Sequence, residues 1–171
     1  EDIARLRAHL ELGRIVLYGQ SWGVTLGLAY AQRYPETVRA AVFAGITTTR
    51  QTEIDWLYRG LGALLPEAYA AFRAGAGDGV DESDLLAAYH ARLMSPVAAI
   101  RERAALDFHL WEGAMLLAEP GGRWPVRWDD PAYRLCRARI VTHYFVHGAW
   151  LEEGQLLAGL DKMRAIPAVL V

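Results

Sequence analysis

The sequence is poor in the features that mark disulfide-bonded, metal-binding, membrane-spanning or nucleic-acid-binding proteins. Cys136 is the single cysteine, which excludes an internal disulfide and a cysteine-rich metal site. No apolar run approaches the roughly 20 residues of a membrane-spanning helix. No basic stripe accompanies the net charge of −2, so neither a membrane nor a nucleic acid is an expected partner. Neither a phosphate-binding glycine loop nor a metal-ligand spacing such as H-E-x-x-H occurs, so no cofactor or metal is expected. A lone thiol and the lack of a signal peptide suggest a cytoplasmic protein.

What the chain does contain is the composition of a globular protein. Its 171 residues are 53% hydrophobic and 22% charged, which predicts one domain or a piece of a larger one. Residues 1–12 have the pattern of a helix already under way, and residues 165–171 have that of a strand that stops with the chain. We therefore expect the interior of a longer protein.

Residues 1–50 have the pattern of a strand, a helix and a second strand. The β-rich runs 14–18 and 38–44 flank a stretch with helical spacing, 24–34, which ends at Pro35. A strand, a helix and a strand within about 30 residues predict a βαβ unit and a parallel sheet with a right-handed crossover. Run 14–18 is of the kind that is buried on both faces of such a sheet.

Residues 51–162 change to a mostly helical period. Asp81 and Asp84 are candidate caps of a helix that continues to Met94, and Ser95-Pro96 is expected as N-cap and first residue of the next helix. The expected helices after Met94 span 95–117, 131–146 and 155–163. The simplest interpretation is a helical insertion between two strands of one sheet, with residues 163–171 bringing the chain back to that sheet.

The run Gly19-Gln20-Ser21-Trp22-Gly23 fits G-x-S-x-G between the predicted strand and helix, the context of a nucleophile elbow. Ser21 would be the nucleophile, on a strained turn whose flanking glycines, Gly19 and Gly23, let strand and helix approach closely. The backbone N–H of Trp22 would donate to the oxyanion of an acyl-transfer intermediate. The alternative is a glycine-rich turn with an incidental serine.

The residues that follow resemble a known family. Residues 19–38, GQSWGVTLGLAYAQRYPETV, are similar to the elbow and following helix of proline iminopeptidases, which are α/β-hydrolases with an inserted all-helical cap. The resemblance continues in order through 44–46, 53–58, 86–93, 111–113, 138–140, 143–145, 155–157 and 166–169. It implies an α/β fold class, a partial α/β-hydrolase fold, with 1–50 as part of the core, 51–162 as the helical cap and 163–171 as a returning core strand.

The same resemblance implies a mechanism. Proline iminopeptidases release an N-terminal proline from peptides with a Ser–Asp–His triad and no metal, and Ser21 matches their nucleophile. The family pattern places the aspartate after the strand that ends at Val171, the histidine further on, and the second oxyanion loop before Glu1. The histidines of this chain fall in or beside predicted helices, where packing or surface roles are more common than catalysis.

The candidate substrate-binding residues also come from the resemblance. Glu112 matches one of two amine-binding glutamates, and a buried cation does require a carboxylate partner. The second glutamate position is occupied by Val141. Thr47 stands where the family has a pocket phenylalanine, and Tyr58 is the one member present of an aromatic pair.

Three functional interpretations remain open. The first is a serine hydrolase that forms an acyl-enzyme and releases N-terminal proline, a serine aminopeptidase acting on a peptide or a small amide or ester. The second, which Val141 and Thr47 motivate, is a hydrolase of esters or amides without a free amine. The third is a catalytically incomplete fragment or a non-enzymatic helical interaction domain. We expect these 171 residues alone to be inactive and poorly stable. The oligomeric state is left open.

Overall fold

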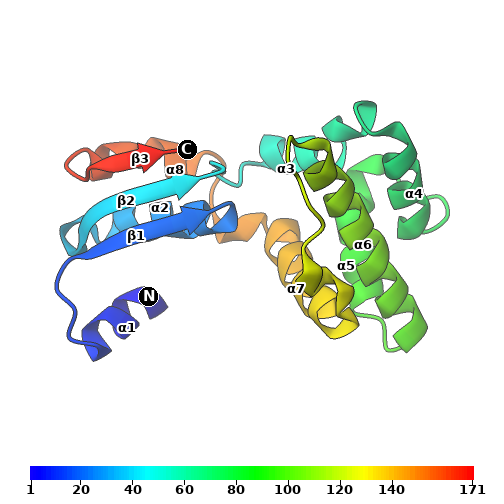
Figure 1. Cartoon of the computed structure of the whole chain (residues 1–171), viewed down its shortest axis with the longest axis horizontal. Coiled ribbons are helices and arrows are strands. Elements are labelled where there is room, and N and C mark those ends of the chain that lie inside the picture. The colour runs from blue at the N-terminus through cyan, green and yellow to red at the C-terminus, as the bar shows by residue number, and fades with distance from the viewer. The chain divides into compact units, whose positions relative to one another are not determined.

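The computed structural model describes all 171 residues, which form two compact units. The first, here called the sheet unit, comprises Glu1–Glu53 and Leu151–Val171. The second, the helical unit, comprises Ile54–Trp150. The two segments of the sheet unit come from opposite ends of the chain, as the blue and red ribbons of Figure 1 show.

The sheet unit contains a parallel sheet of three strands in the order β1-β2-β3 (Figure 1). The strands are β1 (Ile15–Gln20), β2 (Val38–Ala44) and β3 (Ala168–Leu170). Its helices are α1 (Asp2–His9), α2 (Trp22–Arg33), α8 (Gln155–Ala158) and two short 3₁₀ turns, Pro35–Thr37 and Leu160–Met163. The predicted βαβ unit is confirmed, and β3 joins it through parallel pairing with β2.

The close packing of α2 on β2 depends on a small residue. A Cβ added to Gly27 would lie 2.6 Å from the ring of Phe43, so no larger side chain fits there. Leu17, Val24 and Phe43 form the centre of the core between the sheet and α2.

The expectation that run 14–18 is buried on both faces is wrong for this chain. Val16 is 58% and Tyr18 75% exposed, whereas Leu17 is buried against α2. Successive strand residues point to opposite faces, and α2 packs on the Leu17 face only.

The helices of the helical unit pack around a core that is rich in aromatic side chains. Its elements are the C-terminal part of α3 (Gln51–Tyr58), then α4 (Pro66–Ala76), α5 (Leu85–Leu93), α6 (Ala98–Ala118) and α7 (Pro131–Val146), with 3₁₀ turns at Gly60–Ala63, Glu82–Asp84, Val126–Asp129 and Gly148–Trp150. Phe72 stacks on Tyr89 with ring centroids 4.5 Å apart, and Phe108 and Trp111 of α6 complete the cluster. No helix of the chain combines the length and apolar character needed to cross a membrane.

Several predicted helix ends differ from the observed ones. α6 begins at Ala98 rather than at Pro96, because Val97 has an extended backbone and occupies the N-cap position. The Val97 N–H donates to the Ser95 hydroxyl (3.1 Å) in the turn before the helix. Asp81 caps only a 3₁₀ turn, through Ser83 N–H, and Asp84 makes no side-chain cap. The helix expected at 155–163 is divided into α8 and a 3₁₀ turn. By contrast, Asp130 caps α7 as its Asp-Pro sequence suggests.

Candidate active site

The turn that carries Ser21 is strained and well held. Ser21 has φ +52° and ψ −119°, a conformation that residues with a Cβ rarely adopt. Its N–H donates to the carbonyl of Ala44 at the end of β2 (3.0 Å), and its own carbonyl accepts from Val24 N–H (2.7 Å). The elbow is therefore fixed both to the neighbouring strand and to the first turn of α2.

Gly19 is what allows β1 and α2 to meet at this turn. A Cβ at Gly19 would lie 2.4 Å from the carbonyl oxygen of Gly23, whereas a Cβ at Gly23 would meet no atom within 4 Å beyond its own stretch of helix. Trp22 is the first residue of α2, where backbone N–H groups point out of the helix N-terminus and favour negative charge.

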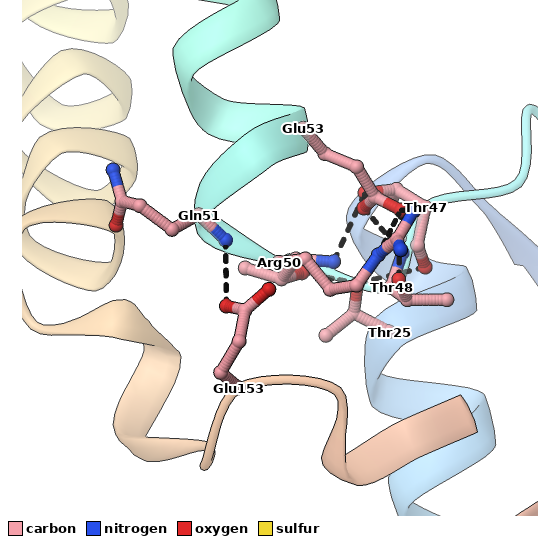
Figure 2. Close-up of polar contacts among 8 residues, drawn as sticks. Thr25, Thr47, Thr48, Arg50, Gln51, Glu53 and Glu153 are labelled. Atoms are coloured by element: carbon pink, nitrogen blue, oxygen red, sulfur yellow. Dashed lines mark hydrogen bonds and ion pairs between the residues drawn. The ribbon is translucent and has the colours of Figure 1, made fainter. Parts of the chain in front are cut away.

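The loop that follows β2, residues 45–50, is organised by Glu53 of α3 (Figure 2). It begins beside the elbow, because it follows Ala44, whose carbonyl accepts from Ser21 N–H. One Glu53 oxygen accepts from Thr48 N–H (2.8 Å) and the Thr47 hydroxyl (3.2 Å). The other accepts from the Thr48 hydroxyl (2.7 Å) and from two guanidinium nitrogens of Arg50 (3.2 Å each). Burial alone would raise the pKa of Glu53, but these hydrogen bonds outweigh it and lower the pKa below its usual value.

Thr47, a candidate substrate contact, is therefore engaged within the protein. Its hydroxyl donates to Glu53 and accepts from Thr49 N–H (3.3 Å). The side chain is partly buried, and its polar atom serves the loop. Sequence reasoning missed Glu53, although its place three residues after Arg50, at the start of a helix, is typical of a residue that bonds back to a helix N-terminus.

Glu112 and Tyr58, two further candidates, meet in the core of the helical unit. The Tyr58 hydroxyl donates to one Glu112 oxygen at 2.9 Å, and both residues are buried. Burial, and then the charge of Glu112, raises the pKa of Tyr58 well above its usual value, so the phenol remains a donor at physiological pH. The second Glu112 oxygen accepts from Arg137 of α7.

Arg137 is the residue of this site that sequence reasoning missed. Its guanidinium lies 4.8 Å from the ring centroid of Trp128 and forms an ion pair with Glu112. Arg137 and Val141 are four residues apart on α7 and so share one helix face. The spacing places Arg137 on the same helix face as Val141, the position at which the resemblance to proline iminopeptidases implies a carboxylate, but it does not show that Arg137 meets Glu112.

The histidines of the helical unit do not form a metal site, and the chain has no group of three potential ligands arranged to hold a metal ion. His109 is fully buried, and its Nδ1 bonds to the Ala105 carbonyl at 2.9 Å. Desolvation lowers the pKa of His109 to about 4, so its ring is neutral at physiological pH. His90 Nδ1 bonds to the Thr142 hydroxyl at 3.1 Å. Both rings have packing partners, as expected.

A parallel sheet whose first strand ends in a strained G-x-S-x-G turn and runs into a helix defines an α/β-hydrolase core. Residues 1–114 match the sequence profile of the α/β hydrolase fold, and the chain belongs to this family. It is 40% identical over 174 residues to a probable proline iminopeptidase of Streptomyces coelicolor, in an alignment that covers 99% of this chain and 53% of the relative. The resemblance to proline iminopeptidases is thus confirmed.

Two further relatives agree. The chain is 40% identical over 172 residues to the proline iminopeptidase of Xylella fastidiosa strain Temecula1 (99% of this chain, 55% of the relative). It is 37% identical over 172 residues to that of Arabidopsis thaliana (99% and 45%). The chain therefore spans about half the length of the curated relatives it matches.

Proposed function

We propose that the full-length protein is a serine hydrolase of the proline iminopeptidase type, in which Ser21 forms an acyl-enzyme with a peptide or a small amide or ester. The observation that carries this proposal is the strained backbone of Ser21 between β1 and α2. A strained serine at this place presents its hydroxyl above the carboxyl edge of the sheet, where open α/β sheets bind ligands. The names of the relatives support a peptide substrate.

In the proposed reaction, Ser21 Oγ attacks the carbonyl carbon of the scissile bond while a general base takes the hydroxyl proton. The carbonyl oxygen becomes an oxyanion, towards which Trp22 N–H donates. The intermediate collapses as the leaving amine or alcohol accepts the proton, and water then hydrolyses the acyl-enzyme by the same steps. We place the base and its carboxylate partner in the half of the protein outside these 171 residues.

We further propose that residues 51–162 act as a cap on a core formed by 1–50 and 163–171. The separate packing of the helical unit supports this division. In this proposal Ser21 and Trp22 of the core act in the reaction, and Gly19 lets β1 and α2 approach at the elbow. Thr47 of the core, and Glu112 and Tyr58 of the cap, are the candidate substrate residues.

The function is tested with full-length protein and proline p-nitroanilide. Ser21→Ala should lower kcat by at least about 10³-fold, because the acyl-enzyme cannot form. Ser83→Ala is the matched control, since Ser83 lies exposed in a 3₁₀ turn with only Asp81 as its partner, and it should keep wild-type kcat. Ser21-independent hydrolysis would refute the proposal.

A second candidate function, hydrolysis of amides or esters without a free amine, is favoured by the Glu112–Arg137 ion pair. A buried carboxylate that is paired with a partly exposed arginine offers little net charge to an incoming ammonium group. The other buried carboxylate of the helical unit, Asp107, is paired with Arg103 at 2.8 Å. With Val141 adding no charge, the buried carboxylates of this unit are all neutralised by arginines.

The two candidates are separated by the ratio of kcat/KM for proline p-nitroanilide to that for its N-acetyl form. If Arg137 neutralises the site, Arg137→Met should raise this ratio about tenfold or more, because Glu112 would then be free to pair with an ammonium group. Arg134→Met is the control, since Arg134 donates to the Trp128 carbonyl and not to Glu112. The ratio is independent of the folded fraction, and an unchanged ratio would reject the second candidate.

A further inference from the structure

Glu53 makes more hydrogen bonds than its place in the helix requires. It is the third residue of α3, where a glutamate ordinarily bonds back to the N–H of the N-cap residue. Here the carboxylate accepts three hydrogen bonds from Thr47 and Thr48, which lie before the N-cap position. It accepts two more from the guanidinium group of Arg50. These contacts fix the path of the 45–50 loop.

Of these contacts, the ion pair with Arg50 contributes least to fixing the path of the loop. The Arg50 and Glu53 side chains are 39% and 28% exposed, so solvent screens their attraction. The threonine contacts are directional and lie in a better protected place, because Thr48 is 8% and Thr49 7% exposed. The geometry of the loop therefore depends on which atoms the Glu53 carboxylate accepts from, rather than on its charge alone.

The loop is in turn bonded to the helix that carries the elbow. The Thr25 hydroxyl of α2 bonds to the Thr49 hydroxyl at 2.7 Å and to the Thr47 carbonyl at 3.3 Å (Figure 2). Thr25 is buried and follows Ser21 by four residues, about one helical turn. Thr49 has φ +58°, a conformation that a β-branched residue adopts only when its surroundings hold it.

We propose that Glu53 is a positioning residue for the nucleophile: through Thr47–Thr49 and Thr25 its carboxylate fixes the first turn of α2, and thereby the orientation of Ser21 and of the Trp22 N–H. The role of Ser21 in this proposal rests on the proposed function. The structural part, the link from Glu53 to the elbow, stands on the hydrogen bonds alone.

Glu53→Gln is the informative substitution, because it keeps the size of the side chain and replaces one acceptor oxygen by an N–H₂ donor. Whichever way the amide lies, its N–H₂ faces either Thr48 N–H or Arg50, and both of those groups are donors. At least one of the Glu53 contacts is then lost, the one to Arg50 in one orientation of the amide and the one to Thr48 N–H in the other, and the loop is held less firmly.

The first measurement is hydrogen exchange in the full-length protein. Glu53→Gln should speed exchange of the Ser21 and Val24 amides about tenfold, since these two amides hold the elbow to Ala44 and close the first turn of α2. The second is the rate at which a fluorophosphonate labels Ser21, which should fall about tenfold. Steady-state kinetics should show the loss in kcat, because the acyl-transfer step is affected. KM does not decide the inference, since Thr47, a candidate substrate contact, lies in the same loop.

Glu153→Gln is the matched control. Glu153 accepts from Gln51 N–H at 2.9 Å, so it also bonds to the start of α3, but none of its hydrogen bonds involves the threonines of the loop (Figure 2). It should leave both rates at their wild-type values. Thr25→Val, which removes the link and leaves Glu53 in place, should reproduce the effect of Glu53→Gln.

Wild-type exchange and labelling in Glu53→Gln would overturn the inference, and so would a normal Thr25→Val variant. If Glu53→Gln lowered only the melting temperature and left the labelling rate of the folded protein unchanged, Glu53 would be merely structural, and the inference would also fail. If the proposed function is wrong, hydrolysis will not depend on Ser21. Hydrogen exchange at the Ser21 and Val24 amides would still test the connection between Glu53 and the elbow.

Discussion

Ser21 adopts a backbone conformation that few residues with a side chain tolerate, and its neighbours explain how. Its N–H and carbonyl are both bonded, to Ala44 and Val24, and Gly19 leaves space for the carbonyl of Gly23. These contacts offset the backbone strain at Ser21, which is of order 1–3 kcal/mol. They also hold the backbone of Ser21 in one place, as a nucleophile would require.

Gly19→Ala should therefore disrupt the elbow. Its Cβ would lie 2.4 Å from the Gly23 carbonyl oxygen, and since the Cβ is fixed to the backbone of the strand and the carbonyl belongs to the backbone of the helix, strand and helix would have to separate. We expect a loss of at least about 2 kcal/mol in the free energy of unfolding of the full-length protein, measured by urea denaturation. Gly13→Ala is the control, because its Cβ meets no atom within 4 Å. Equal effects of the two substitutions would contradict the packing described.

His109 should make the stability of the helical unit depend on pH. Burial lowers its pKa from 6.5 to about 4, so the folded state binds fewer protons than the unfolded state between these values. Its contribution is complete above pH 6.5 and is lost as the pH falls toward 4, by up to about 3 kcal/mol. Urea midpoints of wild type and His109→Gln, compared from pH 7 to pH 4, measure it. Parallel curves would show that His109 has no part in the acid sensitivity.

Secondary-structure elements were predictable where a single segment carries the signal. The apolar runs around 14–18 and 38–44, and the helical spacing between them, are local patterns, and β1, α2 and β2 follow them. The start of α6 was not predicted correctly, because Val97 keeps an extended backbone and takes the N-cap position two residues after Ser95, which the Ser-Pro sequence does not reveal. The Glu112–Arg137 pair depends on two distant helices meeting, which no local pattern encodes.

The cap of α7 illustrates a local signal that does hold. Asp130 accepts from Ala132 N–H at 2.9 Å, with Pro131 at the first helical position. Asp130→Ala should lower the free energy of unfolding of the full-length protein by about 1 kcal/mol, measured by thermal or urea denaturation. Asp84→Ala provides the comparison, since Asp84 makes no side-chain cap at α5. A larger loss at Asp84 than at Asp130 would contradict the assigned caps.

The chain as a whole leaves apolar surface on its sheet unit uncovered. Val16, Tyr18, Val169 and Leu170 are each more than half exposed, and the chain spans about half the length of its relatives. The location of the nucleophile could be predicted from the sequence, because the elbow is a local motif. The groups that would activate it could not be assigned to residues, because none of the 171 residues carries their motif.

The 171 residues on their own should consequently lack hydrolytic activity and be poorly stable. We expect no turnover of proline p-nitroanilide above background, and increased binding of the dye ANS to the exposed apolar surface, compared with the full-length protein. Both are measured on purified proteins at equal concentration. Turnover by the 171-residue chain that disappears in its Ser21→Ala variant would disprove this expectation.

The most direct test of the account is to titrate the full-length enzyme with a fluorophosphonate and locate the adduct by mass spectrometry. The account predicts one adduct per chain, on Ser21, with activity falling in proportion to labelling. An enzyme that loses its activity with the adduct on another residue, or that keeps full activity when Ser21 is completely labelled, would contradict it.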